Sequence, residues 1–175
     1  MGPEPDGFTA QSFHDPDDRE CTLSCRFDHM IEQLRKMQND LLEMRYRAHS
    51  GAYFSKLLRR ARVVSQDVLD DLLEEATASG VLSGDDVDEV RLADIVVRGR
   101  RPGTFEEIYV VVEVSAVIDA HDVARAARRA GLLARLRPAV GVVAGDEIIP
   151  EAETIAKSAG VWQLLDGRAI DPHAA

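Results

Sequence analysis

The chain has 175 residues, enough for one ordinary domain with an appendage but too few for two full domains. Its 45% of apolar residues can fill a core, whereas only 5% of aromatic residues argues against a surface built on aromatic stacking. The net charge of −10 argues against a polyanionic partner for the chain as a whole. Because no apolar run is long enough to span a membrane and the N-terminus is acidic, we expect no membrane contact and a cytoplasmic location.

The charge is distributed unevenly along the sequence. Residues 1–20 hold six acids against one arginine, and residues 66–94 hold ten acids against one arginine. The remainder of the chain is therefore net positive. This distribution leaves room for a local polyanion-binding surface despite the acidic total.

Residues 1–24 are rich in Pro, Gly and Asp without periodicity, so we expect a disordered tail. Residues 25–50 follow a different pattern, predicting a coiled-coil helix whose apolar residues recur with 3-4 spacing over about three heptads: Phe27, Met30, Leu34, Met37, Leu41, Met44 and Ala48. We call these seven residues the heptad seam. Such a narrow seam favours a homodimer or higher oligomer through residues 27–48, and the alternative is a helix folded back on its own domain.

A basic segment follows the seam and contains six cations without an acid: Arg45, Arg47, Lys56, Arg59, Arg60 and Arg62. Aromatic residues interleave with these cations, a pattern typical of contacts to DNA or RNA. The alternative is an arginine-rich helix that pairs with the acidic residues after it. Both interpretations stay open.

Residues 51–91 are predicted as a helical region. Ser65 is a helix N-cap and Gly80 ends that helix, while Ser83 with Asp86 begins a second, shorter helix. Both helices turn their carboxylates outward, and we expect these to form a solvated face.

Two strands are predicted in the stretch Leu92–Ser115, on either side of a turn at Pro102 and Gly103. A two-residue turn places Asp94 opposite Val111 and diagonal to Glu113, so Asp94, Glu113 and Ser115 share one sheet face. A slip of two residues keeps this arrangement and a slip of one destroys it. The other face then carries five apolar residues: Ile95, Val97, Val110, Val112 and Val114.

The remaining elements complete a mixed α/β sheet. A helix opens at Asp119 and runs to about Arg137, with Arg125, Arg128, Arg129 and Arg135 expected on its outward face. A buried strand over 139–144, a helix over 150–158 and a strand over 161–165 follow. Residues 92–166 thus form an α/β core, and residues 167–175 form a tail that should fray.

Two acids on adjacent antiparallel strands, followed by a helix and a strand, resemble the PD-(D/E)xK nuclease superfamily with its restriction-endonuclease-like core. Asp94 falls on the Asp position and Glu113 on the (D/E) position, while Ser115 stands where the superfamily has Lys and Ala93 where it has Pro. The resemblance covers roughly the second half of the chain. It implies Asp94, Glu113 and Ser115 as catalytic positions, with Asp94 and Glu113 holding Mg²⁺ or Mn²⁺ if the site is active.

Whether the chain is an enzyme stays open, because Ser115 cannot supply the charge of the missing Lys. His121, Arg125 and Arg129 on the following helix are candidate substitutes, and both arginines are also candidate nucleic-acid contacts. In many members a helical Glu joins the metal site, which by resemblance would be Glu75 or Glu89.

Three functions follow as hypotheses. The first is a degenerate nuclease-like domain that binds nucleic acid or a partner protein and dimerises through its N-terminal helix, with Asp94 and Glu113 as relics or paired with Arg98 or Arg128. The second is an active metal-dependent nuclease that uses Asp94 and Glu113. The third is a structural oligomerisation protein without nucleic-acid binding.

Overall fold

The computed structural model of the chain describes residues 16–173, with side chains from Leu23 onward. The chain divides into two units, residues 1–36 and residues 37–175. Within the described part, no helix combines the length and apolar character needed to cross a bilayer.

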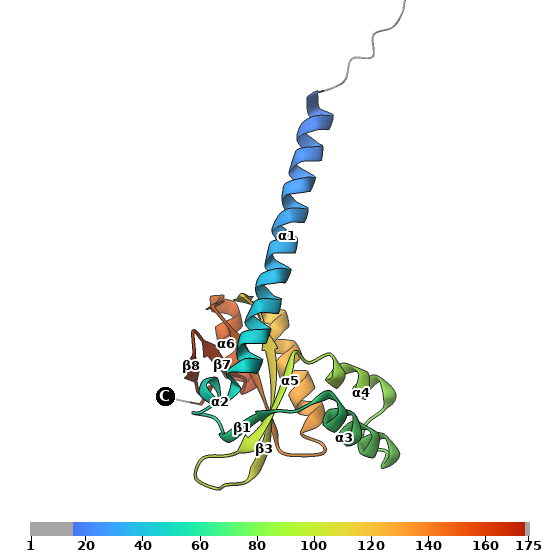
Figure 1. The fold of residues 1–175 in the computed structure, drawn as a ribbon, viewed down its shortest axis with the longest axis vertical. Coiled ribbons are helices and arrows are strands. Elements are labelled where there is room, and N and C mark those ends of the chain that lie inside the picture. The colour runs from blue at the N-terminus through green and yellow to red at the C-terminus, as the bar shows by residue number, and fades with distance from the viewer. Residues whose placement is uncertain (1–15, 174–175) are drawn as a thin grey trace, which may run out of the picture. The chain divides into compact units, whose positions relative to one another are not determined.

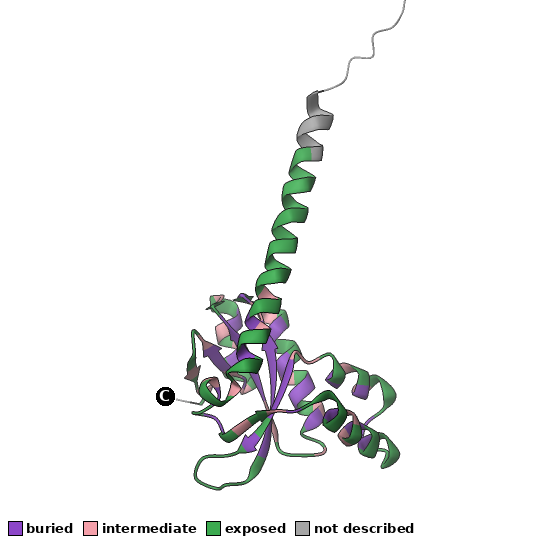
Figure 2. Cartoon of the chain, in the orientation of Figure 1, coloured by how far each residue is buried: buried purple, intermediate pink, exposed green. Residues whose placement is uncertain are grey.

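The first element is the helix α1 (Pro16–Ala48). It begins within the residues expected to be disordered and eight positions before Ser24, the expected cap; residues 1–15 of the expected tail lie outside the described residues. Residues 23–36 are exposed, as the colouring of α1 in Figure 2 shows. The six large residues of the heptad seam, from Phe27 to Met44, are each 53% to 61% exposed.

The last turns of α1 bury a different set of residues against the α/β unit. Leu42 and Tyr46 are buried in the core, and the Tyr46 hydroxyl lies 3.4 Å from the carbonyl oxygen of Leu164. Asn39 accepts a hydrogen bond of 2.9 Å from the Ala116 N–H. Met37, Leu41 and Met44 therefore take no part in the packing of this unit.

The sequence predicted a helical region over residues 51–91, but this stretch also contains a strand. After the short helix α2 (Ser50–Tyr53) comes a strand, β1 (Arg59–Val63), which includes the last three arginines of the basic segment. The strand pairs antiparallel with β2 (Ile95–Arg100), with an irregularity between Arg59 and Arg62. In an alternating sequence such as Arg-Ala-Arg-Val, strand periodicity places the arginines on one side.

Two acidic helices follow, and their start signals are those read from the sequence. Ser65 is the N-cap residue of α3 (Gln66–Ala78), and Gly80 adopts a positive φ of 72° after its end. Ser83 and Asp86 form a reciprocal capping box at the start of α4 (Gly84–Arg91).

In the rest of the chain, pairs of strands alternate with single helices (Figure 1). In chain order they are β3 (Glu107–Val114), β4 (Val117–Ile118), α5 (Ala120–Leu133), β5 (Ala139–Gly145), β6 (Glu147–Ile148), α6 (Pro150–Ala159), β7 (Trp162–Leu165) and β8 (Arg168–Ile170). The main sheet has the order β1-β2-β3-β5-β7-β8, with parallel pairing only along β3-β5-β7. The fold is therefore mixed α/β, as predicted, and β8 adds a strand within the expected tail.

The two faces of the sheet pack against different helices. The face predicted to be apolar carries Ile95, Val97, Val110, Val112 and Val114, all buried together with residues of α1 and of the segment after α2. On the other face, α3, α4, α5 and α6 cover Val96, Val111 and Val143. A side chain at Gly141 would place its Cβ 2.8 Å from the Ala126 carbonyl oxygen, so α5 lies directly on β5.

Candidate functional site

The β2-β3 hairpin brings Asp94 and Glu113 to the same strand end. Ile95 pairs with Val112, which extends to Asp94 opposite Glu113; the register is two residues from the predicted one. The turn is longer than two residues, because the last pair is Arg100 with Glu107. Since the side-chain period of a strand is two, this difference leaves both acids on the predicted face.

Asp94 lies just before β2, and its side chain forms a hydrogen bond with the last residue of β3. Its Oδ2 accepts a hydrogen bond of 2.7 Å from the Val114 N–H, and its carbonyl oxygen accepts one from the Arg47 guanidinium. Burial raises the pKa of Asp94, an effect opposed by the Val114 N–H and reinforced by Glu43. One carboxylate oxygen of Asp94 is therefore already engaged in a hydrogen bond with the backbone of β3.

Glu113 lies in a buried ion-pair network. Its side chain is 1% exposed, and both of its oxygens accept hydrogen bonds from Nη1 of Arg129, at 2.8 and 2.7 Å. Nε of Arg125 donates a third bond, 3.1 Å long, to Oε2. Arg129 also donates from Nε to Glu89 over 3.0 Å and from Nη1 to the Leu92 carbonyl oxygen over 2.8 Å.

The position of Arg129 differs from the prediction of an outward-facing residue. Arg129 is buried with Asp122, Ala126 and Leu133, which follow the 4-3-4 spacing of one helical face. That spacing is legible in the sequence and places Arg129 inward. Arg125 is exposed but turns back, with Nη2 2.5 Å from Oδ1 of Asp122.

The pKa values of this network follow from burial. Burial raises the pKa of Glu113 to about 7, with Arg129 acting in the opposite direction and Asp94 adding to the rise. For Arg129 burial disfavours the charge, but the hydrogen bonds to Glu113 and Glu89 outweigh it, so the net pKa is raised. The guanidinium thus stays charged beside the acid.

The ion pairs of Glu113 determine whether its carboxylate is free to bind a divalent cation. Both Glu113 oxygens face guanidinium groups, and Ser115 Oγ donates to the Val117 carbonyl oxygen over 2.9 Å rather than pointing at either acid. From Leu23 to His173, where side chains are described, there is no group of three or more His, Cys, Asp or Glu arranged to hold a metal. As arranged here, Asp94 and Glu113 do not offer a free pair of carboxylates to Mg²⁺ or Mn²⁺.

Other candidates of the sequence analysis fall elsewhere. Glu89 joins the Arg129 network instead of a solvated face, whereas Glu75 is an exposed partner of Arg137 at 3.5 Å. His121 is exposed on the first turn of α5. Arg128 pairs with Glu89 at 3.4 Å, and among the described residues it forms no ion pair with either acid of the hairpin.

The predicted nucleic-acid residues separate into two groups. Arg45 pairs with Asp146 at 3.5 Å and Arg47 pairs with Glu43 at 2.7 Å, while Arg125 and Arg129 belong to the Glu113 network. Lys56, Arg59, Arg60 and Arg62 are exposed and, among the described residues, make no ion pair. The second group is therefore exposed and without a competing acid among the described residues.

Two further arginines join this second group at the edge of the sheet. Arg62 pairs with Arg98 and Arg59 with Arg100 across the β1-β2 ladder. A hollow of about 250 Å³ is lined by Arg60, Arg62, Arg98 and Arg100 with Gly99 and Glu107. We call the five exposed arginines of this edge the arginine patch: Arg59, Arg60, Arg62, Arg98 and Arg100.

The backbone holds the arginine patch in place. Arg60 has a positive φ of 55° at the irregularity of β1, where the regular antiparallel ladder is interrupted. A Cβ on Gly99 would lie 2.9 Å from the Leu58 Cβ and 3.0 Å from the Arg59 carbonyl oxygen. The absence of that atom lets β1 close over β2 between Arg98 and Arg100.

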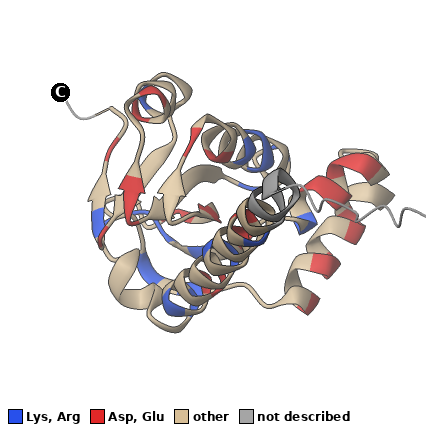
Figure 3. Cartoon of the chain, turned by 90° about the horizontal axis from the view of Figure 1, so that it is seen from above, with Lys and Arg blue, Asp and Glu red and all other residues tan. Residues whose placement is uncertain are grey.

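The acidic helices do not neutralise the arginine patch. Their acids, which appear as bands on α3 and α4 at the right of Figure 3, pair instead with arginines of α4, of α5 and of the segment after α5. The pairs are Arg91 with Asp70 and Asp88, Arg128 and Arg129 with Glu89, Arg135 with Asp86, and Arg137 with Glu75. The alternative interpretation, in which residues 45–62 form a helix that pairs with these acids, is wrong because Arg59–Val63 is a strand and the partners come from α4, α5 and the segment after α5.

The sequence analysis missed Arg98 and Arg100 as members of a basic surface. Their alternation with Val97 and Gly99 places them on one side of a strand, a signal that the sequence carries. Arg59 is 41 positions before its partner Arg100 and Arg62 is 36 positions before its partner Arg98, so only the β1-β2 pairing connects the two runs.

Comparisons of the chain with protein-family models, with curated proteins and with solved structures gave no match.

Proposed function

We propose that this protein is a cytoplasmic, nuclease-like domain with a degenerate site, which binds nucleic acid through the arginine patch and self-associates through its N-terminal helix. The observation that carries the proposal is the arginine patch itself. Its five guanidinium groups are exposed and, among the described residues, have no ion-pair partner, although the chain as a whole is acidic.

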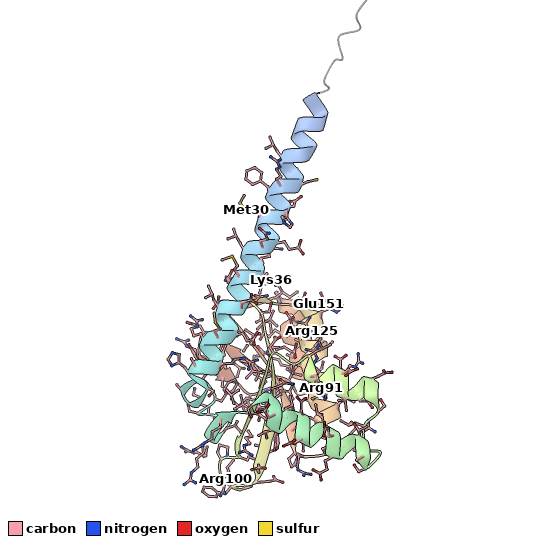
Figure 4. All side chains as sticks on the ribbon, turned by 45° about the vertical axis from the view of Figure 1, so that its right-hand side comes forward. Met30, Lys36, Arg91, Arg100, Arg125 and Glu151 are labelled. Carbon is pink, nitrogen blue, oxygen red and sulfur yellow. The ribbon has the colours of Figure 1, made fainter. Side chains whose placement is uncertain are left out.

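The chemistry of the arginine patch suits phosphate. Guanidinium groups present planar pairs of donors that match phosphate oxygens, and several on one edge neutralise successive phosphates of a backbone. Glu107 is the one acid lining the hollow, against four arginines. Arg100 lies at the hairpin end of the domain, away from Arg125 of the Glu113 network (Figure 4).

The proposed kinship with the restriction-endonuclease-like core rests on the hairpin and the elements after it. Asp94 and Glu113 occupy one strand end, followed by α5, β5 and α6. The Glu113 network supports the degenerate form, because Arg129 supplies the positive charge that a metal ion would otherwise bring to that acid.

Self-association is the second part of the proposal. The packing of residues 37–48 uses Leu42 and Tyr46 and leaves Met37, Leu41 and Met44 exposed, which argues against a helix folded back along its seam. A second copy of the same helix is the occupant that a sustained heptad seam fits. In a parallel, in-register pair, Asp40 and Arg45 would occupy the g and e positions that attract each other across the interface.

Two alternatives make different predictions. An active metal-dependent nuclease, with Mg²⁺ or Mn²⁺ held by Asp94 and Glu113, requires the Arg129 guanidinium to leave Glu113 and requires cleavage that Glu113→Ala abolishes. A structural oligomerisation protein requires a folded oligomer with no affinity for DNA or RNA.

The test is fluorescence anisotropy with labelled single-stranded and double-stranded DNA and with single-stranded RNA. The double variant Arg62→Gln/Arg100→Gln removes two charges of the arginine patch, and Arg128→Gln/Arg168→Gln removes two exposed charges elsewhere on the same domain. We expect roughly a tenfold or greater loss of affinity in the first variant and little change in the second. Equal losses in both variants, or no binding by the wild type, contradict the proposal.

A further inference from the structure

A pocket opens at the hairpin end of the sheet, on the face opposite the Glu113 network and the side chains of Arg98 and Arg100. Its volume is about 300 Å³, at the lower end of the range for small-ligand sites. Ile108, Val110 and Val140 of β3 and β5 form an apolar floor, and Trp162 of β7 adds an aromatic wall. Trp162 is the only tryptophan of the chain and is only partly buried.

Two cations belong to the lining of this pocket. Lys56 comes from the segment after α2 and Arg101 from the β2-β3 turn, and no acid lines the pocket. Lys56 is exposed and makes no ion pair among the described residues. Arg101 has one long contact, 4.0 Å to Glu106, between two half-exposed side chains, which costs little to exchange for another anion.

The pocket and the arginine patch share the same chain segments. Leu58, which lines the pocket, precedes Arg59 of the arginine patch, and Arg101 follows Arg100. Arg101 directly follows Arg100 and Lys56 is three residues before Arg59, so a flexible anionic chain bound along the arginine patch reaches the pocket cations by passing round this end of the sheet. Trp162 is the one aromatic side chain that lines the pocket with them.

We propose that this pocket receives one unpaired base of a single-stranded nucleic acid. The inference rests on the proposed function and specifies its substrate class. The base ring packs against Trp162 and the apolar floor, while Lys56, Arg101 and the arginine patch hold the flanking phosphates. A base stacked inside a duplex cannot enter, so single strands, or duplexes with an unpaired base, are the preferred ligands.

The experiment uses the full-length protein and two readouts on the same samples. Anisotropy of a labelled 20-nucleotide single strand and of its matched duplex measures binding, and intrinsic tryptophan emission with unlabelled strands reports on the pocket, because Trp162 is the sole source. We expect the single strand to bind at least roughly tenfold more tightly than the duplex and to quench the emission, since base stacking on an aromatic ring contributes this much affinity.

Two variants separate stacking from folding. Trp162→Leu removes the ring and should lower single-strand affinity roughly tenfold, whereas Trp162→Phe keeps a ring and should recover most of it. Lys56→Gln lies at an exposed position and should weaken single-strand binding severalfold without touching the core.

The failures of the two proposals are distinguishable. If single strand and duplex bind equally, emission is unmoved and Trp162→Leu binds like the wild type, then the base pocket is overturned while nucleic-acid binding stands. If neither form raises the anisotropy, both proposals are overturned.

Discussion

Glu113 accepts hydrogen bonds at both carboxylate oxygens from one nitrogen, Nη1 of Arg129, and the two side chains are 1% and 7% exposed. A buried charge pair of this kind is costly to break on one side, because the partner that stays is left charged and without compensation. The Glu113 network also includes Glu89, so Arg129 serves two acids at once.

Replacement of Arg129 should therefore destabilise the fold far more than replacement of its neighbour. We expect Arg129→Met to lower the free energy of unfolding by about 3–5 kcal/mol, because Glu113 and Glu89 lose their shared partner. Arg128→Met is the matched control. Arg128 is 65% exposed and forms a single ion pair of 3.4 Å with Glu89, so its replacement should lower the free energy of unfolding by less than about 1 kcal/mol. Urea unfolding of both variants measures the difference, and similar losses would contradict the role of Arg129.

The stability of the fold should depend on pH through Glu113. Its pKa is about 7 in the folded chain and near 4.5 ordinarily, so the folded state binds the proton more tightly than the unfolded state. The stabilisation is complete below about pH 4.5 and is lost as pH rises through 7, and it amounts to about 3 kcal/mol. Burial of Asp94 acts in the same direction.

The measurement is the unfolding free energy at several values between pH 5 and pH 8. Wild type should become less stable over this window, and Glu113→Gln should show a flatter profile because position 113 no longer titrates. Wild type and variant profiles that run parallel would show that Glu113 does not titrate near neutral pH.

Divalent metal should not bind at the two acids of the hairpin. With Glu113 held by Arg129 and Arg125, and Asp94 by the Val114 N–H, calorimetric titration of manganese should give the same small heat for wild type and Asp94→Asn. Heat in wild type that disappears in Asp94→Asn would instead support the active nuclease.

The oligomeric state should depend on the heptad seam. Leu34→Asp or Leu41→Asp places a charge within a face that is otherwise apolar, and we expect a folded monomer by light scattering or sedimentation. Arg35→Asp changes an exposed neighbour off the seam on the same helix and should leave the oligomer intact. A monomeric wild type, or monomers from both kinds of variant, would contradict self-association through the seam.

Much of the fold could be predicted because local signals were strong. Ser83 with Asp86 and Asp119 with Asp122 mark two helix starts by capping boxes, and the Val-rich runs of β2 and β3 fix which residues face the core. The hairpin register differed by two residues because Gly103 and Phe105, both with positive φ, belong to a longer turn than Pro102-Gly103 suggests.

The candidate site was less predictable because it depends on contacts between distant segments. Strand β1 has only five residues with three arginines and weak apolar character, so nothing local distinguishes it from a helix end. The helical spacing of Asp122, Ala126, Arg129 and Leu133 predicts that Arg129 faces the sheet, so Arg129 could have been identified as the partner of Glu113 from the sequence. That Glu89 would share this arginine depends on how α4 packs beside α5, which the sequence alone does not specify.

The most direct measurement is the salt dependence of single-strand affinity. Each phosphate neutralised by the arginine patch contributes about −0.7 to the slope of log K against log salt concentration. Arg62→Gln/Arg100→Gln should therefore make the slope shallower by roughly 1.4, while Arg128→Gln/Arg168→Gln should leave it unchanged. A slope that is the same in wild type and both double variants would contradict binding through the arginine patch.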